Sequence, residues 1–205
     1  MSPSNETAVA AIDAWPQWAS HGLALIGPAG SGKSHLGHVW RRLSGANAIA
    51  AAAVDEPAVL GIDGSPGAVV EDVDRGIGDE KALFHLLNLA REHGFHLLFT
   101  ARTPPGEWTI ALPDLRSRLR ALPVVHIGAP DEQLLTAVLV KLLADRQLPA
   151  TPTAVEYLAR HMERSMQLAG DLVAELDRMV WRDRREVTRE MAKQALATLT
   201  GTVGD

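Results

Sequence analysis

The sequence contains no cysteine among its 205 residues, and this absence excludes disulfide bonds and thiolate metal sites. It has no apolar run long enough to span a membrane, because the alanine-rich stretch 46–54 is short and contains Asn47. An excess of positive charge is also missing: the formal net charge is -5, which gives no overall sign of nucleic-acid binding. Since the first residues also lack the basic segment and apolar core of a signal peptide, we expect a soluble cytoplasmic protein.

Patterns of several enzyme classes are missing as well. The eight histidines include no set of metal ligands, since His35 and His38 lie three residues apart without a third ligand. No nucleophile elbow or catalytic triad pattern occurs. Arginines cluster at 182–185, but an acidic residue is interleaved and no aromatic platform accompanies them, so we interpret the cluster as a solvated helix end rather than a nucleic-acid patch. The 46% hydrophobic content is that of an ordinary globular protein.

One stretch carries a phosphate-binding pattern. Residues 27–34 read Gly-Pro-Ala-Gly-Ser-Gly-Lys-Ser and satisfy the P-loop pattern G-x-x-x-x-G-K-[ST]. The glycines let backbone N–H groups approach phosphate oxygens, Lys33 supplies a positive charge, and Ser34 offers a hydroxyl to Mg²⁺. An apolar strand before the loop and a helix after it, with Leu36, Trp40 and Leu43 at helical spacing, provide the context that the motif requires. The predicted nucleotide contacts are Gly27, Pro28, Ala29, Gly30, Ser31, Gly32, Lys33, Ser34 and His35.

A second informative stretch is an apolar strand that ends in carboxylates. Residues 68–74 read Ala-Val-Val-Glu-Asp-Val-Asp. In a P-loop ATPase, one acid at this edge holds the Mg²⁺ shell and a neighbour orients or activates the attacking water. We predict Ser34, Glu71 and Asp72 as Mg²⁺ ligands and Asp72 also as a catalytic residue; the alternative is a strand that simply runs into an acidic turn. The common order is Asp then Glu, and the shorter side chain of Asp72 argues against fast hydrolysis by the chain itself.

Two further patterns lie near the expected site. Thr100 and Arg102 end the predicted strand 95–101, at which many such ATPases carry a polar residue that senses the γ-phosphate. Trp15 and Trp18 stand just before the first strand. We interpret the tryptophans as packing at a helix end, because tryptophan is first a large apolar group; a wall near the adenine is the alternative.

Helices alternate with short apolar strands through the first 128 residues. Strands are expected at 21–26, 47–52, 68–72, 95–101 and 123–127, and a first helix is capped by Ser4 or Asn5 and ends at Pro16. From Pro130 on the pattern is helical, with helices that begin at Asp131, at Thr151 and Pro152, before Leu168, and at Thr188. The fold class predicted is α/β: a core with a parallel sheet flanked by helices over residues 1–128, followed by a small all-α subdomain over 129–205.

A short basic helix is expected at 112–120, before the last strand. Most arginines occupy a solvated face, and this is one interpretation of Arg116, Arg118 and Arg120. The other is an arginine finger, a guanidinium that a protein offers to the γ-phosphate in a neighbouring subunit.

These motifs occur in the order found in AAA+ ATPases, and nearly the whole chain resembles one group of them. The resemblance rests on residues 2–6 (Ser-Pro-Ser-Asn-Glu), the P-loop, 70–72 (Val-Glu-Asp), 103–105 (Thr-Pro-Pro) and 112–119 (Leu-Pro-Asp-Leu-Arg-Ser-Arg-Leu). The chain is similar to the Hda (HdaA) group, the short relatives of the bacterial replication initiator DnaA. The P-loop is generic, whereas the Leu-Pro-Asp-Leu-x-Ser-Arg-Leu helix is much more specific.

The resemblance implies an AAA+ core over residues 1–128 and a helical lid over 129–205. Members of the group promote hydrolysis of ATP bound to DnaA once they are loaded on the sliding clamp, and so prevent repeated initiation. By resemblance, Arg118 is the finger that acts in trans on the initiator's ATP, and Gln167 contacts the nucleotide from the lid. The implied cofactors are ADP or ATP with Mg²⁺. The implied partners are DnaA, the sliding clamp and further copies of the chain, with no direct DNA binding and no membrane.

The chain departs from the group's pattern in several places. The short Gln- and Leu-rich clamp-binding motif is missing from the sequence, so no residue is assigned to the clamp. Gln167 occupies the place of a lid arginine, with Arg164 as a second candidate, and Arg102 replaces the usual Asp or Asn of the sensor strand. No DNA-binding helix-turn-helix follows the lid, which argues against origin recognition. The changes at Gln167 and Arg102 predict weak or no ATPase activity of the chain alone.

Other functions fit parts of the pattern. A P-loop kinase needs a lid with several arginines that face the phosphates, and the apolar stripes of the expected lid helices disfavour it. A helicase-loader-like module that binds single-stranded DNA needs a basic groove, for which the net charge of -5 offers little. A P-loop ATPase of another class is the third alternative.

Overall fold

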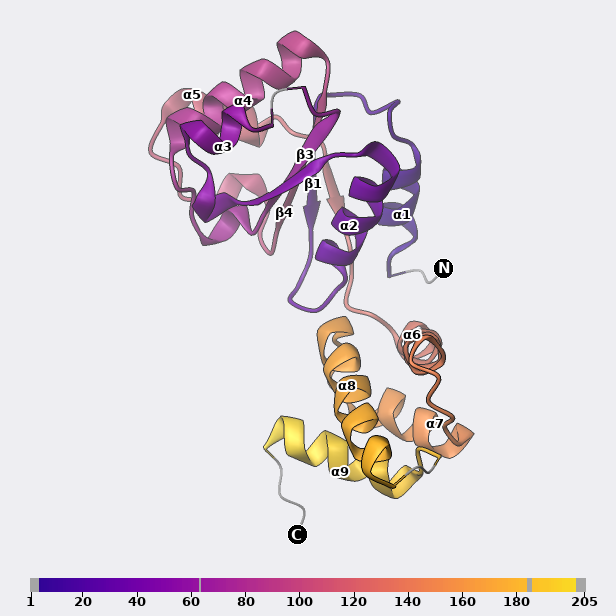
Figure 1. The fold of residues 1–205 in the computed structure, drawn as a ribbon. Helices are drawn as coiled ribbons and strands as arrows, with labels where there is room; N and C mark the ends of the chain where they lie inside the picture. Colours follow the sequence, from indigo (N-terminus) through magenta and orange to yellow (C-terminus); the bar gives the residue numbers. More distant parts are fainter. Residues whose placement is uncertain (1–3, 63, 184–185, 202–205) are drawn as a thin grey trace. The chain divides into compact units, whose positions relative to one another are not determined.

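The computed structural model describes residues 4–62, 64–183 and 186–201, and of residues 181–183 only the backbone (Figure 1). The strands are β1 (Gly22–Ile26), β2 (Asn47–Ala50), β3 (Gly67–Glu71), β4 (His96–Ala101) and β5 (Val124–His126). The α-helices are α1 (Glu6–Asp13), α2 (Lys33–Ser44), α3 (Glu56–Leu60), α4 (Glu80–His93), α5 (Pro113–Arg120), α6 (Glu132–Asp145), α7 (Pro152–His161), α8 (Met166–Asp183) and α9 (Arg189–Thr200). Short 3-10 helices are η1 (Ala51–Ala53), η2 (Val73–Arg75) and η3 (Pro105–Glu107).

The strands form one sheet in the order β2-β3-β4-β1-β5, and every neighbouring pair is parallel. This confirms the α/β fold class predicted from the sequence. Because all strands run the same way, their carboxyl ends meet at one edge of the sheet, which is where ligands bind in open α/β sheets. The P-loop after Ile26, the acidic segment after Glu71 and the residue after Ala101 therefore come to the same edge.

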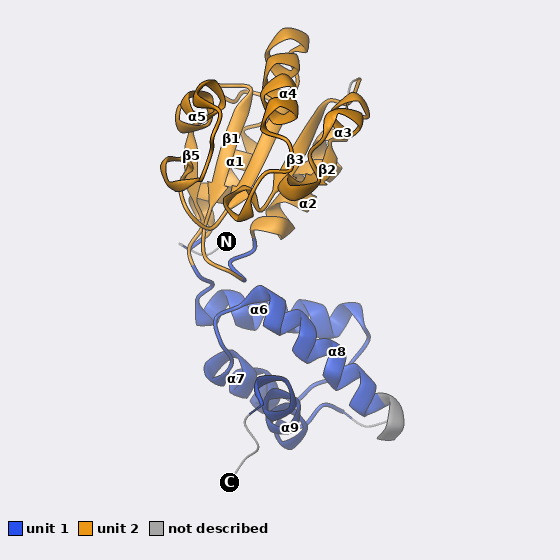
Figure 2. Cartoon of the chain, turned by 90° about the vertical axis from the view of Figure 1, so that its left-hand side faces the viewer, with its two compact units in different colours: residues 1–4, 30–32, 129–205 blue, residues 5–29, 33–128 orange. Residues whose placement is uncertain are grey.

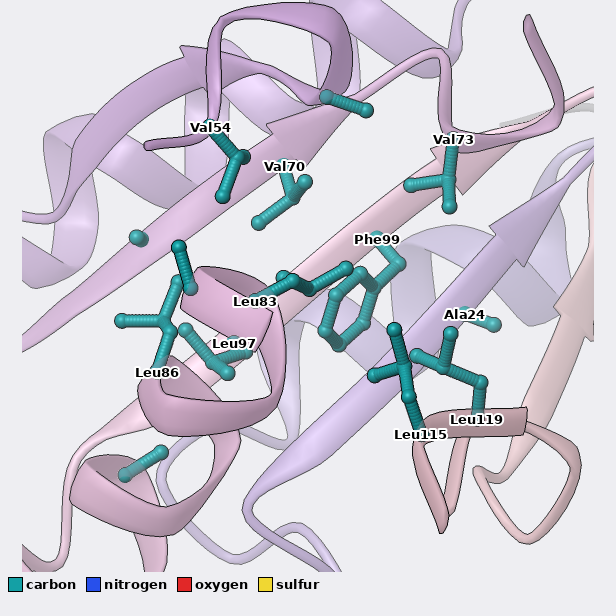
Figure 3. Close-up of a cluster of buried hydrophobic side chains, with 14 of the residues drawn as sticks. Ala24, Val54, Val70, Val73, Leu83, Leu86, Leu97, Phe99, Leu115 and Leu119 are labelled. Atoms are coloured by element: carbon teal, nitrogen blue, oxygen red, sulfur yellow. The ribbon is translucent and has the colours of Figure 1, made fainter. Parts of the chain in front are cut away.

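Helices cover both faces of this sheet, and each face has its own apolar cluster. Figure 3 shows the cluster under α4 and α5, where Leu83, Leu86, Leu115 and Leu119 pack against strand residues such as Phe99. On the opposite face α1 and α2 pack against alternate residues of the same strands. Since side chains of a strand alternate between faces, a strand covered on both sides must be apolar throughout, which explains the continuous apolar runs of β1 and β4.

Capping side chains lie at the starts of several helices, and a few elements differ from the boundaries that the sequence predicts. Side chains of Asp55, Asp79, Asp131, Thr151 and Thr188 accept backbone N–H groups at the starts of their helices. Asn5 stands at the start of α1, but its side chain makes no capping hydrogen bond. The strand expected over 47–52 ends at Ala50, because alanine favours strands weakly and 51–53 turn into η1. Leu43, in the helical stripe with Leu36 and Trp40, is 59% exposed.

The tryptophans before β1 are packing residues. Trp18 stacks on Trp40 of α2 with ring centroids 5.2 Å apart, and its Nε1 donates to the carbonyl of Ala11 at 2.7 Å. Trp15 meets Trp40 edge to face at 6.3 Å. Both rings also lie against His96, the first residue of β4, at the amino end of the sheet. The packing interpretation is thus confirmed, and the adenine-wall alternative is wrong because the P-loop follows the opposite, carboxyl end.

The chain divides into two compact units (Figure 2). One comprises residues 5–29 and 33–128 and contains the sheet. The other comprises Ser4, the loop tip 30–32 and the chain from Ala129 on, and its helices α6–α9 enclose a separate apolar core. In the described part of the chain, none of the helices combines the length and apolar character needed to cross a bilayer. The side chains of the arginine cluster 182–185 lie outside the described residues.

Candidate nucleotide-binding site

The P-loop joins β1 to α2 and is anchored to the sheet at its start. The N–H of Gly27 donates to the carbonyl of Ala101 at the end of β4, at 3.1 Å. Gly30 and Gly32 have φ values of 69° and 102°, in the region where a side chain would clash with its own backbone. These two glycines therefore allow the tight loop that turns successive N–H groups toward an anion.

Lys33 begins α2 and is folded back onto this loop. Its Nζ donates to the carbonyls of Gly27 at 2.7 Å and Pro28 at 2.8 Å, and the residue is only 8% exposed. Burial lowers the pKa of Lys33 below its ordinary value, because the ammonium loses water, while the nearby carboxylate of Asp72 opposes that shift. The structure thus holds a buried cation beside an acidic strand end, which is the charge arrangement expected of a phosphate site.

Asp72 follows β3 in an uncommon backbone conformation. Its φ of 58° and ψ of 44° lie in the left-handed region, which aspartate adopts more readily than most residues. Its N–H donates to the hydroxyl of Thr100 at 3.2 Å, and its carboxylate pairs with Arg75 at 3.2 Å. Thr100, predicted as a γ-phosphate sensor, is buried and holds the turn after β3 through this hydrogen bond.

Asp74 Oδ1, in the sheet unit, is a buried polar atom with no hydrogen-bond partner among the described residues. Buried oxygens are normally hydrogen-bonded, so atoms of this kind fit a site meant for further groups. The negative charge of Asp74, in η2, favours the charged form of Lys33 and so opposes the lowering of its pKa. Sequence reasoning missed Asp74 as a site residue. The one available signal was its position two residues beyond Asp72.

The residues present fit a nucleotide with a divalent cation. The P-loop supplies turned backbone N–H groups and Lys33, and the adjoining edge supplies carboxylates. No cluster of three or more His, Asp or Glu side chains occurs within the described ranges, but Mg²⁺ at nucleotide sites commonly takes one or two carboxylates, with phosphate oxygens and waters completing its shell. A preformed cage of protein ligands is therefore not required.

The other predicted residues lie at different places. Glu71 is the half-buried last residue of β3, and Ser34 and His35 are exposed in the first turn of α2. Arg102 follows β4, and its positive charge contributes to lowering the pKa of Lys33. Gln167 belongs to the helical unit, at the start of α8, where its amide donates to Asp171 at 3.1 Å. The structure thus brings Lys33, Asp72, Asp74 and Arg102 together within the sheet unit, while Gln167 and the exposed Arg164 lie in the other.

Arg118 lies on α5 and is held by α4. Its Nη1 donates to Asn88 Oδ1, and its guanidinium lies 4.4 Å from the ring centroid of Phe84. Arg116 and Arg120 on the same helix are exposed. Sequence reasoning missed both partners, because they precede Arg118 by 30 residues or more and no local pattern marks them.

The strand order, the P-loop after β1 and the helical unit that follows the sheet define an AAA+ P-loop NTPase fold. Within that class the fold is DnaA-like. Domain III of the replication initiation protein DnaA from Thermotoga maritima superposes with a TM-score of 0.78 at 17% identity, covering 97% of this chain and 93% of that one.

Two other solved structures show the same fold. The replication initiator DnaA bound to AMPPCP and single-stranded DNA gives a TM-score of 0.65 at 16% identity, over 90% of this chain and 66% of that one. The FIGL-1 AAA domain in complex with ADP gives a TM-score of 0.69 at 18% identity, over 98% of this chain and 81% of that one. No protein-family profile and no curated protein sequence matches the chain. At these identities the likeness shows the fold alone.

Proposed function

We propose that this chain is a nucleotide-binding AAA+ regulator of replication initiation, similar to the Hda group, which promotes hydrolysis of ATP bound to the initiator DnaA. Its chemical contribution is made in trans by Arg118. The observation that carries the proposal is the way Arg118 is held: a ring beneath the guanidinium and one hydrogen bond to Asn88 orient it on the surface of a DnaA-like fold.

The chain's own site is proposed to hold ADP or ATP with Mg²⁺. Support comes from the P-loop geometry and from two solved neighbours that carry AMPPCP and ADP. Residues 27–35 would surround the phosphates, Gln167 would contribute from the lid, and Ser34, Glu71 and Asp72 would face the cation. When bound, Mg²⁺ supplies charge neutralisation at the phosphates. We further propose residues 1–128 as the nucleotide-binding core and 129–205 as the lid.

Self-hydrolysis is proposed to be weak. A carboxylate that activates water must reach the attacking oxygen, and the carboxylate of Asp72 is short and pairs with Arg75 at 3.2 Å. The nucleotide then serves as a structural and regulatory component, and catalysis takes place at the partner's ATP.

Arg118 suits that role chemically. A guanidinium has five N–H donors in a planar fork, and the bond to Asn88 uses Nη1. The remaining donors can meet the charge that develops on a transferred γ-phosphoryl group, a contribution worth about 10³–10⁵ in rate for arginine fingers.

The proposal is tested by measuring hydrolysis of ATP bound to DnaA, with this protein and the DNA-loaded sliding clamp present. Arg118→Ala should lower the stimulated rate at least about 100-fold. Arg116→Ala and Arg120→Ala remove the same charge from the same helix at exposed positions and serve as controls that should retain most activity. If the unmodified protein leaves the initiator's ATP intact, or if Arg118→Ala stimulates as well as the controls do, the proposed function is wrong.

A further inference from the structure

A carboxylate on α4 holds the start of α5. Oε1 of Glu80 accepts the N–H of Ala111 at 2.8 Å, and Oε2 accepts the N–H of Leu112 at 2.6 Å. Ala111 and Leu112 directly precede Pro113, the first residue of α5, so their N–H groups have no partner within the helix. A residue more than 30 positions upstream therefore supplies what the local sequence lacks.

The same face of α4 also holds Arg118. Glu80, Phe84 and Asn88 are spaced four residues apart, so their side chains follow one another along a single face of the helix. Glu80 fixes the first end of α5, while Phe84 and Asn88 fix the guanidinium one turn and a half further along. Leu115, between these points, and Leu119, next to Arg118, are buried and pack α5 against the core.

We infer that Glu80 is a positioning residue for Arg118, an inference that rests on the proposed function. Its carboxylate sets where α5 begins and so where the guanidinium stands relative to a partner's γ-phosphate. Without this bidentate contact the position of α5 relies more on its buried apolar side chains, Leu115 and Leu119, whose contacts are less directional than charge-assisted hydrogen bonds. A displacement of about 1 Å at a reacting group costs up to about 100-fold in rate, so loss of Glu80 acts on the rate and not on the binding of the partner.

The test compares Glu80→Gln and Glu80→Ala in the stimulated hydrolysis assay. Glutamine keeps one acceptor oxygen and nearly the same volume, whereas alanine keeps neither. We expect the maximal stimulated rate to fall about threefold in Glu80→Gln and about tenfold in Glu80→Ala. The concentration for half-maximal stimulation and the affinity for ADP should stay within about twofold. Hydrogen exchange of both the Ala111 and Leu112 amides should accelerate in Glu80→Ala, which removes both acceptors, and exchange of at least one of them should accelerate in Glu80→Gln, which keeps a single acceptor oxygen.

Glu92→Gln is the matched control, since it removes the same charge from an exposed position on the same helix. The inference is overturned if Glu80→Gln and Glu80→Ala equal Glu92→Gln in maximal rate, if only the half-maximal concentration changes, or if exchange at Ala111 and Leu112 is unaffected. Measuring Arg118→Ala in the same assay distinguishes failure of the positioning role of Glu80 from failure of the proposed function. A full effect of Arg118→Ala with no effect at Glu80 overturns the positioning role alone, whereas no effect of Arg118→Ala overturns the proposed function.

Discussion

Lys33 illustrates how much of the site is decided by single residues. Its ammonium is buried and donates to two carbonyls of its own loop, and its pKa is lowered by that burial. A phosphate group would replace these carbonyls with full negative charge, which is a stronger partner for a desolvated cation. The Lys33 ammonium is therefore better suited to bind an anion than to bind the two carbonyls of its own loop.

Replacing Lys33 with alanine should therefore abolish useful nucleotide binding. We expect the affinity for ADP, measured by isothermal titration calorimetry, to fall at least about 100-fold, because a charge-assisted contact at the phosphates is lost in a partly desolvated site. Lys81→Ala, at an exposed position on α4, is the control and should bind normally. Wild-type affinity in Lys33→Ala would show that the Lys33 ammonium does not contribute to nucleotide binding.

At the scale of elements, α4 joins two parts of the sheet unit, because it packs on the core of the sheet and also contacts α5. Its start is capped by Asp79, whose Oδ1 accepts the N–H groups of Lys81 and Ala82 at 2.8 and 3.3 Å. Gly94 ends the helix with a φ of 77°, the left-handed conformation that glycine adopts without penalty. One face of α4 packs on the core and another carries the contacts to α5, so its register affects both.

Removing the cap should destabilise this unit measurably. Asp79→Ala is expected to lower the free energy of unfolding by about 1 kcal/mol, the typical value for loss of an aspartate cap. Urea denaturation followed by circular dichroism measures it. Asp79→Asn, which can still cap, should stay within a few tenths of a kcal/mol of the wild type. Equal midpoints for the alanine and asparagine variants would contradict the capping role.

Elements with local signals were predictable from the sequence, and long-range contacts were not. The helix that begins after Asp79 and ends at Gly94, and the apolar strand at 95–101, follow from capping residues and short-range periodicity. No such rule predicts that Glu80 binds the backbone before α5, because Glu80 precedes Ala111 and Leu112 by 31 and 32 residues. The left-handed turn at Asp72 depends likewise on Thr100, which comes from another strand.

At the scale of the whole sheet unit, stability should depend on pH through His96. Burial, and secondarily the neighbouring His21, lower the pKa of His96 below its ordinary value of 6.5; its ring lies against Trp15, Trp18 and His21. The unfolded chain therefore takes up a proton at a higher pH than the folded one. The neutral ring's contribution to stability is fully present above about pH 6.5 and is lost as the pH falls from there through the lowered folded pKa.

His96→Gln should flatten this dependence. We expect the loss in unfolding free energy between pH 7.5 and 5.5, measured by urea titrations, to be smaller in the variant than in the wild type. His85→Gln, at an exposed position on α4, should retain the wild-type loss. An identical pH dependence in His96→Gln and the wild type would mean that other groups determine acid stability.

The left-handed backbone conformation at Asp72 also limits which single substitutions this position can accept in evolution. A glutamate there would supply the longer carboxylate that favours hydrolysis of bound ATP, yet this backbone conformation is held more readily by aspartate, asparagine or glycine than by longer side chains. Tolerated substitutions at this position therefore remove the carboxylate more easily than they extend it.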